Sequence, residues 1–185
     1  ASHVGFREAL FTGLAPDGGL FMPRTIPRLD AEIFSEKRSF PELAAAMIHP
    51  FIGDEIEERD LLDITESAFC FPVPLVPLGE RVHILELFHG PTLAVKGCAE
   101  RFMARMMQHL LKVEGEELTI LVATSGDTGG AVADAFHMQD GIRVVVLYPK
   151  GRVSAIQQSQ LTTLGGNVTA LEVDGSFDDC QRMVK

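Results

Sequence analysis

The sequence lacks the features that mark membrane, nucleic-acid-binding or disulfide-stabilised proteins. No uncharged apolar stretch among its 185 residues approaches the roughly 20 residues of a spanning helix, and the N-terminus has no secretory signal pattern. No run of lysine or arginine offsets the formal net charge of -10, which disfavours binding to nucleic acid or anionic membranes. The three cysteines, Cys70, Cys98 and Cys180, have neither disulfide nor zinc-site spacing. We therefore expect a soluble cytoplasmic protein without a metal.

The first 80 residues have helical patterns separated by turn residues. Ser39 is a suitable N-cap for a helix over 41–51, with Pro41 in its first turn. A further helix is predicted after Asp54, extending to Ala68. The proline-rich segment 71–79 then indicates a stiff, extended connector. We therefore predict a mainly helical N-terminal segment over 1–80 and a second domain over 81–185.

In the second part, short runs rich in Val, Ile and Leu alternate with segments of helical length. The strand-like runs are 82–88, 118–124, 142–148 and 167–173, and the helical segments are 98–113, 128–138 and 153–165. A last helix should open at Ser176, with Asp179 completing a variant capping box. This alternation predicts an α/β fold in which βαβ units build a parallel sheet.

A glycine-rich segment, "TSGDTGG" over 124–130, joins a predicted strand to a predicted helix. Glycines let the backbone approach a ligand closely, and the amides at a helix start favour an anion. No Gly-Lys-Ser/Thr follows, which excludes a P-loop, and the glycine spacing is not that of a dinucleotide fingerprint. The segment is either a carboxylate or phosphate site or a tight structural turn.

Lys96, in "FHGPTLAVKG", raises the question of a reactive amine. A catalytic lysine must lose its proton through desolvation or a positive potential. The apolar residues 93–95 precede Lys96 and a predicted helix start follows it, so both effects are available. Such a lysine suits Schiff-base formation with an aldehyde, whereas an ordinary lysine is a solvated surface charge. Composition alone leaves both open.

Four long motifs occur in an order that resembles threonine synthase. They read "GLAPDGGLFMP", "ELFHGPTLAVK", "ATSGDTGGAVA" and "YPKGRVSAIQQSQLTTLGGNVTALEVDGSFDDCQRMVK". The resemblance implies a fold-type II pyridoxal-phosphate enzyme, similar to the tryptophan synthase β-subunit. It also implies a carbon-oxygen lyase that converts O-phospho-L-homoserine and water into L-threonine and phosphate.

The resemblance also assigns roles to residues. Lys96 matches the lysine that binds pyridoxal 5'-phosphate as an internal aldimine and later moves protons on the substrate. Asp127 occupies a position where many relatives place an asparagine beside the cofactor. Ser176 falls where some relatives bring a polar group toward the substrate phosphate. The segment that holds the substrate carboxylate matches Thr124, Ser125, Gly126, Thr128 and Gly129.

The sequence departs from the family around the lysine and in length. Around the lysine, the family usually reads Phe-Lys-Asp-Phe. This chain instead has Val95, Lys96, Gly97 and Cys98, so three of the four residues differ. Family members are considerably longer, and the remainder carries the loop that binds the cofactor phosphate. The resemblance therefore implies an N-terminal portion with an incomplete sheet, inactive when isolated.

Other functions stay open at this point. A related phospholyase would release a 2-oxo acid from the same substrate. A non-catalytic homologue would keep the fold without the chemistry, which the changes at Gly97 and Cys98 motivate. His89 is either a cofactor contact or a turn residue, and Lys150 and Arg152 either face the substrate phosphate or lie in a solvated loop.

Overall fold

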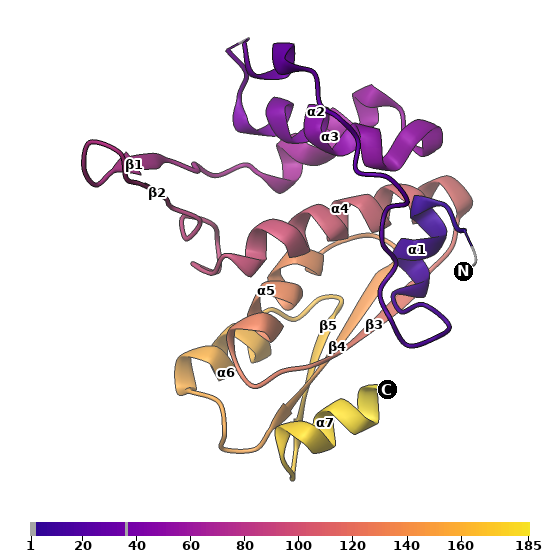
Figure 1. The fold of residues 1–185 in the computed structure, drawn as a ribbon. Coiled ribbons are helices and arrows are strands. Elements are labelled where there is room, and N and C mark those ends of the chain that lie inside the picture. Colours follow the sequence, from indigo (N-terminus) through magenta and orange to yellow (C-terminus); the bar gives the residue numbers. More distant parts are fainter. Residues whose placement is uncertain (1–2, 36) are drawn as a thin grey trace. The chain divides into compact units, whose positions relative to one another are not determined.

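A computed structural model of the chain describes residues 3–35 and 37–185 (Figure 1). The chain divides into two compact units, with the boundary between Cys70 and Phe71. This boundary precedes the position predicted at residue 80. The proline-rich segment 71–79, predicted as a stiff connector, lies in the second unit, where its residues Leu75–Pro77 form a strand of a hairpin.

The first unit is helical. Its helices are α1 (Phe6–Thr12), α2 (Phe40–Ile52) and α3 (Glu58–Ala68), with short 3-10 turns η1 (Ala31–Phe34) and η2 (Gly53–Glu55). Ser39 and Glu42 form the capping box that opens α2, which confirms the predicted N-cap. The Glu55 carboxylate accepts the backbone amides of Phe6 and Arg7 at 2.6 and 2.8 Å, which fixes the start of α1. The buried apolar residues of this unit include Ile52, Ile56, Leu61, Ile64 and Ala68.

The second unit begins with an exposed antiparallel hairpin of β1 (Leu75–Pro77) and β2 (His83–Leu85). The prediction that residues 82–88 form a strand of the parallel sheet is therefore wrong. A strand inside a parallel sheet is apolar on both faces, whereas His83 and Glu86 interrupt this run. The run pairs instead with Leu75–Pro77 of the proline-rich segment, where Pro77 has no amide to donate.

The sheet of the second unit is parallel, in the order β3-β4-β5. Its strands are β3 (Leu118–Ala123), β4 (Ile142–Pro149) and β5 (Val168–Val173), and its helices are α4 (Lys96–Glu114), α5 (Asp127–Phe136), α6 (Ala155–Thr162) and α7 (Phe177–Val184). The predicted α/β fold with a parallel sheet is confirmed. The capping box of Ser176 and Asp179 opens α7 as predicted.

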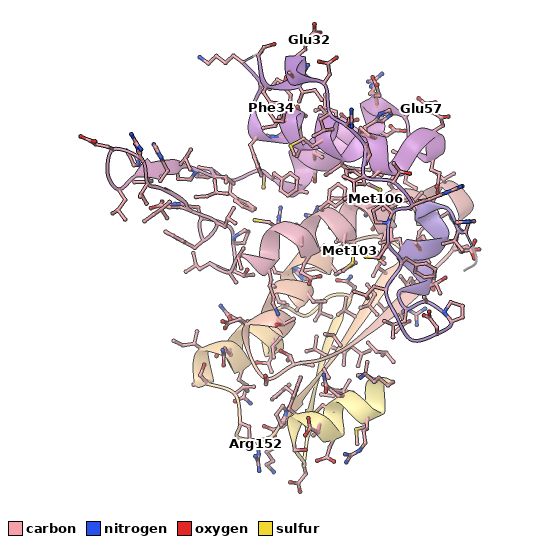
Figure 2. All side chains as sticks on the ribbon, in the orientation of Figure 1. Glu32, Phe34, Glu57, Met103, Met106 and Arg152 are labelled. Carbon is pink, nitrogen blue, oxygen red and sulfur yellow. The ribbon has the colours of Figure 1, made fainter. Side chains whose placement is uncertain are left out.

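Helices cover both faces of this sheet. Figure 1 shows α5 and α6 on one side of the strands and α7 on the other, where α7 contacts β3 and β4. Helix α4 packs on α5 and contributes Met106, which is fully buried (Figure 2). The predicted buried face of α4 is confirmed at Met106, Met107, Leu110 and Leu111.

The parallel strands place their carboxyl ends at one edge of the sheet. The turns after β3, β4 and β5 begin at Thr124, Lys150 and Asp174, so all three leave the sheet at this edge. Ligands of open α/β sheets bind at such an edge. Within the described residues, no helix is long and apolar enough to cross a membrane.

Candidate functional site

Lys96 and the glycine-rich segment meet at this edge. Lys96 is the first residue of α4, and its Nζ donates a hydrogen bond to Oγ1 of Thr128, in the first turn of α5, at 2.7 Å. The two residues are 32 positions apart in the sequence. The structure therefore joins the predicted reactive amine to the predicted anion-binding turn.

The surroundings of Lys96 differ from the sequence-based expectation. Lys96 is exposed, and Leu93 and Val95 are 74% and 57% exposed. These apolar neighbours therefore do not desolvate the amine within this chain. Lys96 is the first residue of α4 and so lies at the positive end of this helix's dipole, as expected.

The turn before Lys96 is locally strained. Leu93 has φ of 55°, a left-handed conformation that is rare for a bulky residue. Its amide donates to the Gly90 carbonyl at 3.0 Å, and the Gly97 amide donates to the Ala94 carbonyl at 3.0 Å. Strained backbone conformations of this kind cluster at functional sites.

Acidic and thiol groups follow Lys96 on α4. Burial raises the pKa of the Glu100 carboxyl, and the positive charge of Lys96 opposes this shift. Burial also raises the pKa of the Cys98 thiol, which favours the inert thiol form. Glu100 is not among the predicted site residues, although its position one turn after Lys96 could have indicated it.

Thr124 organises the glycine-rich segment. Its side-chain oxygen accepts the amides of Gly126 and Gly129 at 3.1 and 2.8 Å and donates to the Gly126 carbonyl at 3.0 Å. Thr124 is only 1% exposed, so these bonds are shielded from water. A Cβ at Gly129 would lie 2.3 Å from Thr124 Cγ2, so this close approach requires glycine. Thr124 therefore shapes the turn from inside, whereas Ser125 is exposed at its surface.

Asp127 contacts a residue that the sequence did not indicate as a site residue. Its Oδ1 accepts a hydrogen bond from Gln157 Nε2 at 2.8 Å. Gln157 lies in the first turn of α6, where it forms a capping box with Ser154. The sequence signal for that capping box is the spacing Ser-x-x-Gln. The contact with Asp127 has no local signal because the two residues are 30 positions apart.

A cavity of about 310 Å³ lies beside this contact. Its walls come from the turn before Lys96, the start of α5 and the start of α6. The lining residues are Thr92, Leu93, Ala94, Asp127, Ser154, Ile156, Gln157 and Gln160. The carboxyl edge of the sheet thus has a cavity next to the amine and the glycine-rich turn.

Ser176 lies at the same edge but has a structural partner. Its Oγ donates to Asp179 Oδ2 at 2.6 Å and accepts the Asp179 amide at 3.2 Å. The hydrogen bonds that the Asp179 carboxylate accepts from the Ser176 hydroxyl and backbone amide, with smaller contributions from Arg182 and Arg152, hold the pKa of this carboxyl below its usual value. Within the described part of the chain, no recorded contact joins Ser176 to Lys96 or Asp127.

His89 has close neighbours on its own segment. His89 Nε2 lies 2.7 Å from Glu86 Oε2, and its ring stacks on Phe88 at 4.7 Å between ring centroids. In residues 3–35 and 37–185, no group of three or more His, Cys, Asp or Glu could hold a metal ion.

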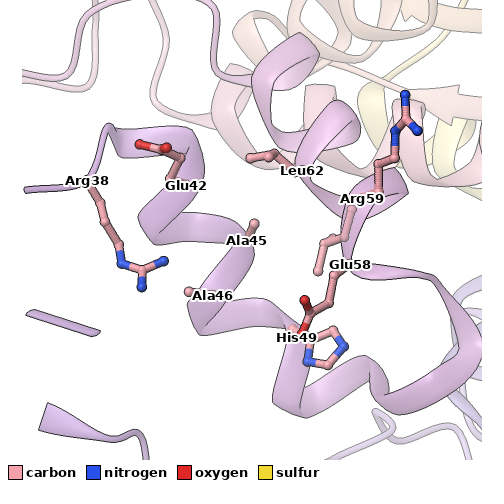
Figure 3. Close-up of a pocket in the computed structure, with 9 residues that line it drawn as sticks. Arg38, Glu42, Ala45, Ala46, His49, Glu58, Arg59 and Leu62 are labelled. Carbon is pink, nitrogen blue, oxygen red and sulfur yellow. The ribbon is translucent and has the colours of Figure 1, made fainter. Parts of the chain in front are cut away.

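A second cavity, of about 680 Å³, lies between α2 and α3 in the first unit (Figure 3). Its floor includes Ala45 and Ala46, and Figure 3 shows Arg38 and Arg59 on opposite sides of it. Glu42 is engaged in the capping box of α2, and the hydrogen bonds from Ser39 lower the pKa of its carboxyl. We place the candidate site in the second unit, where Lys96 and the glycine-rich turn meet.

A lysine amine and a glycine-rich turn at the carboxyl edge of a parallel α/β sheet are typical of enzymes that bind carbonyl compounds and anions. Comparisons with known proteins show what the chain is similar to. Residues 1–69 match the model of the threonine synthase N terminus. The threonine synthase of Escherichia coli is 44% identical over 99% of this chain, and that of Saccharomyces cerevisiae is 41% identical over 98%.

Solved structures agree with the sequence comparisons. The crystal structure of threonine synthase from Brucella melitensis, with pyridoxal phosphate bound, matches all of this chain with a TM-score of 0.93 and 45% identity. The yeast enzyme matches 99% of the chain with a TM-score of 0.90. The chain is therefore similar over nearly its whole length to known threonine synthases. It spans about two fifths of these relatives, 43% of the Escherichia coli protein and 41% of the Brucella chain.

Proposed function

We propose that the protein containing this chain is a threonine synthase, a pyridoxal-phosphate-dependent carbon-oxygen lyase acting on a phosphate. It would convert O-phospho-L-homoserine and water into L-threonine and phosphate. The observation that carries this proposal is the hydrogen bond between Lys96 and Thr128, in a chain similar throughout to a pyridoxal-phosphate-bound threonine synthase. Residues 1–80 would serve as the family's N-terminal segment and residues 81–185 as the first part of the cofactor-binding domain.

The described residues fit pyridoxal 5'-phosphate. Lys96 offers an exposed primary amine, which is the group that bonds covalently to the cofactor's aldehyde carbon. The cavity of about 310 Å³ is lined by Leu93 and Asp127, which lie close to Lys96 and Thr128 in the chain. When bound, the cofactor supplies an electron sink for carbanion chemistry.

Lys96, Thr128 and Asp127 would have different roles at this site. Lys96 would hold the cofactor through Nζ and, once released from it, accept and return protons at the substrate carbons. Thr128 would orient the amine through its present hydrogen bond. Asp127 would contact the cofactor, in the orientation that Gln157 holds.

The glycine-rich turn would bind the substrate carboxylate. Thr124 keeps the amides of Gly126 and Gly129 engaged, so it would act by shaping the turn. The exposed Ser125 and the start of α5 would supply the anion contacts. Ser176 would reach the substrate phosphate only after its hydroxyl turns away from Asp179.

Assay of the full-length protein with O-phosphohomoserine tests this proposal. We expect phosphate and threonine from the wild type and a loss of more than about 100-fold in kcat for Lys96→Ala, since a positioned acid-base group contributes ~10²–10⁴-fold. Lys112→Ala is the matched control, because Lys112 is an exposed lysine in the last turn of the same helix. Release of a 2-oxo acid in place of threonine would identify the related phospholyase instead.

A non-catalytic homologue is the second candidate. The exposed Lys96 and the residues Val95, Gly97 and Cys98 around it favour this alternative. Failure of the full-length protein to release phosphate, together with no spectral change on addition of pyridoxal phosphate, would establish it and overturn the proposed activity.

A further inference from the structure

We propose that Gln157 is a positioning residue of the candidate site, which fixes the Asp127 carboxylate and couples the turn after β3 to the turn after β4. The contact itself is a property of this chain. Its consequence for the cofactor rests on the proposed function. None of the family motifs in this chain assigns a role to this glutamine.

The side chain of Gln157 is bonded at both ends. Nε2 donates to Asp127 Oδ1 at 2.8 Å, and Oε1 accepts the backbone amide of Ser154 at 3.1 Å. The backbone amide of Gln157 in turn donates to Ser154 Oγ at 3.3 Å. Because the side-chain amide group is held from both sides, its direction is set by the start of α6. Asp127 therefore has a partner anchored in a different βα turn.

Gln157 also packs against the glycine-rich turn. A Cβ added to Gly126 would lie 2.7 Å from Gln157 Nε2, so the side chain lies directly over this glycine. Gly126 has an extended φ of 162°, which any residue adopts, so a side chain at this position would act by displacing the Gln157 amide group. Gln157 and Asp127 also line the same cavity.

This arrangement has a chemical consequence. A carboxylate at the start of α5 can rotate about its side-chain bonds, and a single fixed donor restricts that rotation. A hydrogen bond to a charged group is among the stronger polar contacts in proteins. Gln157 thereby acts on the cofactor through Asp127, without touching the reacting atoms.

Substitution of Gln157 by glutamate separates this role from helix capping. Glutamate at the third position of a helix is a favoured capping-box residue, so Gln157→Glu keeps the acceptor for the Ser154 amide. It removes the donor and sets a second carboxylate against Asp127. Asp127→Asn should restore the pair in reverse, because the asparagine amide can donate to the new carboxylate. Alone, Asp127→Asn keeps an acceptor for Gln157.

The first readout is hydrogen exchange of the peptide covering 124–130 in the full-length protein without cofactor. We expect exchange about 10-fold faster in Gln157→Glu, near wild-type rates in Asp127→Asn, and restored protection in the double variant. Gln158→Glu is the matched control, because Gln158 is the next residue of α6 and contacts Tyr148 instead. The second readout is kcat/KM of the holoenzyme, expected to fall about 10- to 100-fold in Gln157→Glu and to recover in the double variant.

The two readouts separate this inference from the proposed function. Unchanged exchange in Gln157→Glu, or faster exchange that the double variant does not reverse, would overturn the role of Gln157. That role would also be overturned if exchange responds as expected but kcat/KM of an active wild type does not respond to Gln157→Glu. A wild type that binds no pyridoxal phosphate would instead overturn the proposed function, while the exchange data still decide the contact.

Discussion

Lys96 Nζ donates to Thr128 Oγ1 at 2.7 Å, and this hydrogen bond joins the starts of two helices, α4 and α5. Both helix starts carry a positive potential, which favours an anionic ligand near them. The contact therefore links the amine to the anion-binding turn.

Loss of the Thr128 hydroxyl should weaken function without unfolding the protein. We expect Thr128→Val in the full-length protein to lower kcat by about 10-fold, the effect of one hydrogen bond to a charged group. Thr128→Ser keeps the hydroxyl and should remain within about 2-fold of the wild type. Equal activity of the Val and Ser variants would show that this hydrogen bond does not orient Lys96.

Loss of the Thr124 hydroxyl should affect stability first. Thr124→Val leaves the buried amides of Gly126 and Gly129 without their acceptor, at a cost of about 3 kcal/mol in the free energy of unfolding. Urea unfolding measures this change. Thr124→Ser should recover most of the loss, and an equally stable Val variant would contradict the structural role of Thr124.

Gly129 should not tolerate a side chain. Gly129→Ala places a methyl group 2.3 Å from Thr124 Cγ2, so we expect a loss of about 1–3 kcal/mol in stability from the overpacked turn. Gly79→Ala is the control, because a Cβ there meets nothing within 4 Å. Thermal unfolding should separate the two variants, and similar melting temperatures would contradict the packing described here.

Asp179 should make stability depend on pH. Its folded-state pKa lies below the usual value of 3.8, so the charged form stabilises the folded state above that pH. As pH falls through the folded-state pKa, the contribution disappears. Asp179→Ala should therefore be less stable than the wild type at pH 7, and the difference should shrink in acid.

Asp178→Ala is the control for Asp179, since both acidic residues lie in the first turn of α7. Unfolding curves at pH 7 and in acid give the comparison. A difference between wild type and Asp179→Ala that is the same at both pH values would contradict the role of the Asp179 charge.

Local signals made much of the fold predictable. The capping boxes at Ser39 and Ser176 depend on residues three positions apart, so they can be read from the sequence. The strands β3, β4 and β5 follow from apolar runs between helical segments. Residues 82–88 have a composition similar to that of these parallel strands. Their antiparallel pairing with the proline-rich segment depends on tertiary structure, which composition does not show.

Long-range contacts account for what the sequence did not reveal. Gln157 resembles any helical glutamine until Asp127, 30 positions away, is placed beside it. Thr124 looked like a ligand contact, whereas its burial against Gly129 makes it an internal brace of the turn. The motifs thus predicted a site whose residues the structure brings together at Lys96 and Thr128, and the folded geometry distinguished buried residues from exposed ones.

Mapping the covalent adduct of pyridoxal phosphate tests the role of Lys96 most directly. The full-length protein would be incubated with pyridoxal phosphate, reduced with borohydride and digested, and the modified peptides identified by mass spectrometry. We predict a dominant adduct at Lys96 that is lost in Lys96→Ala and retained in Lys112→Ala. Labelling scattered over several lysines, or unchanged labelling in Lys96→Ala, would contradict the assignment of Lys96 as the cofactor-binding amine.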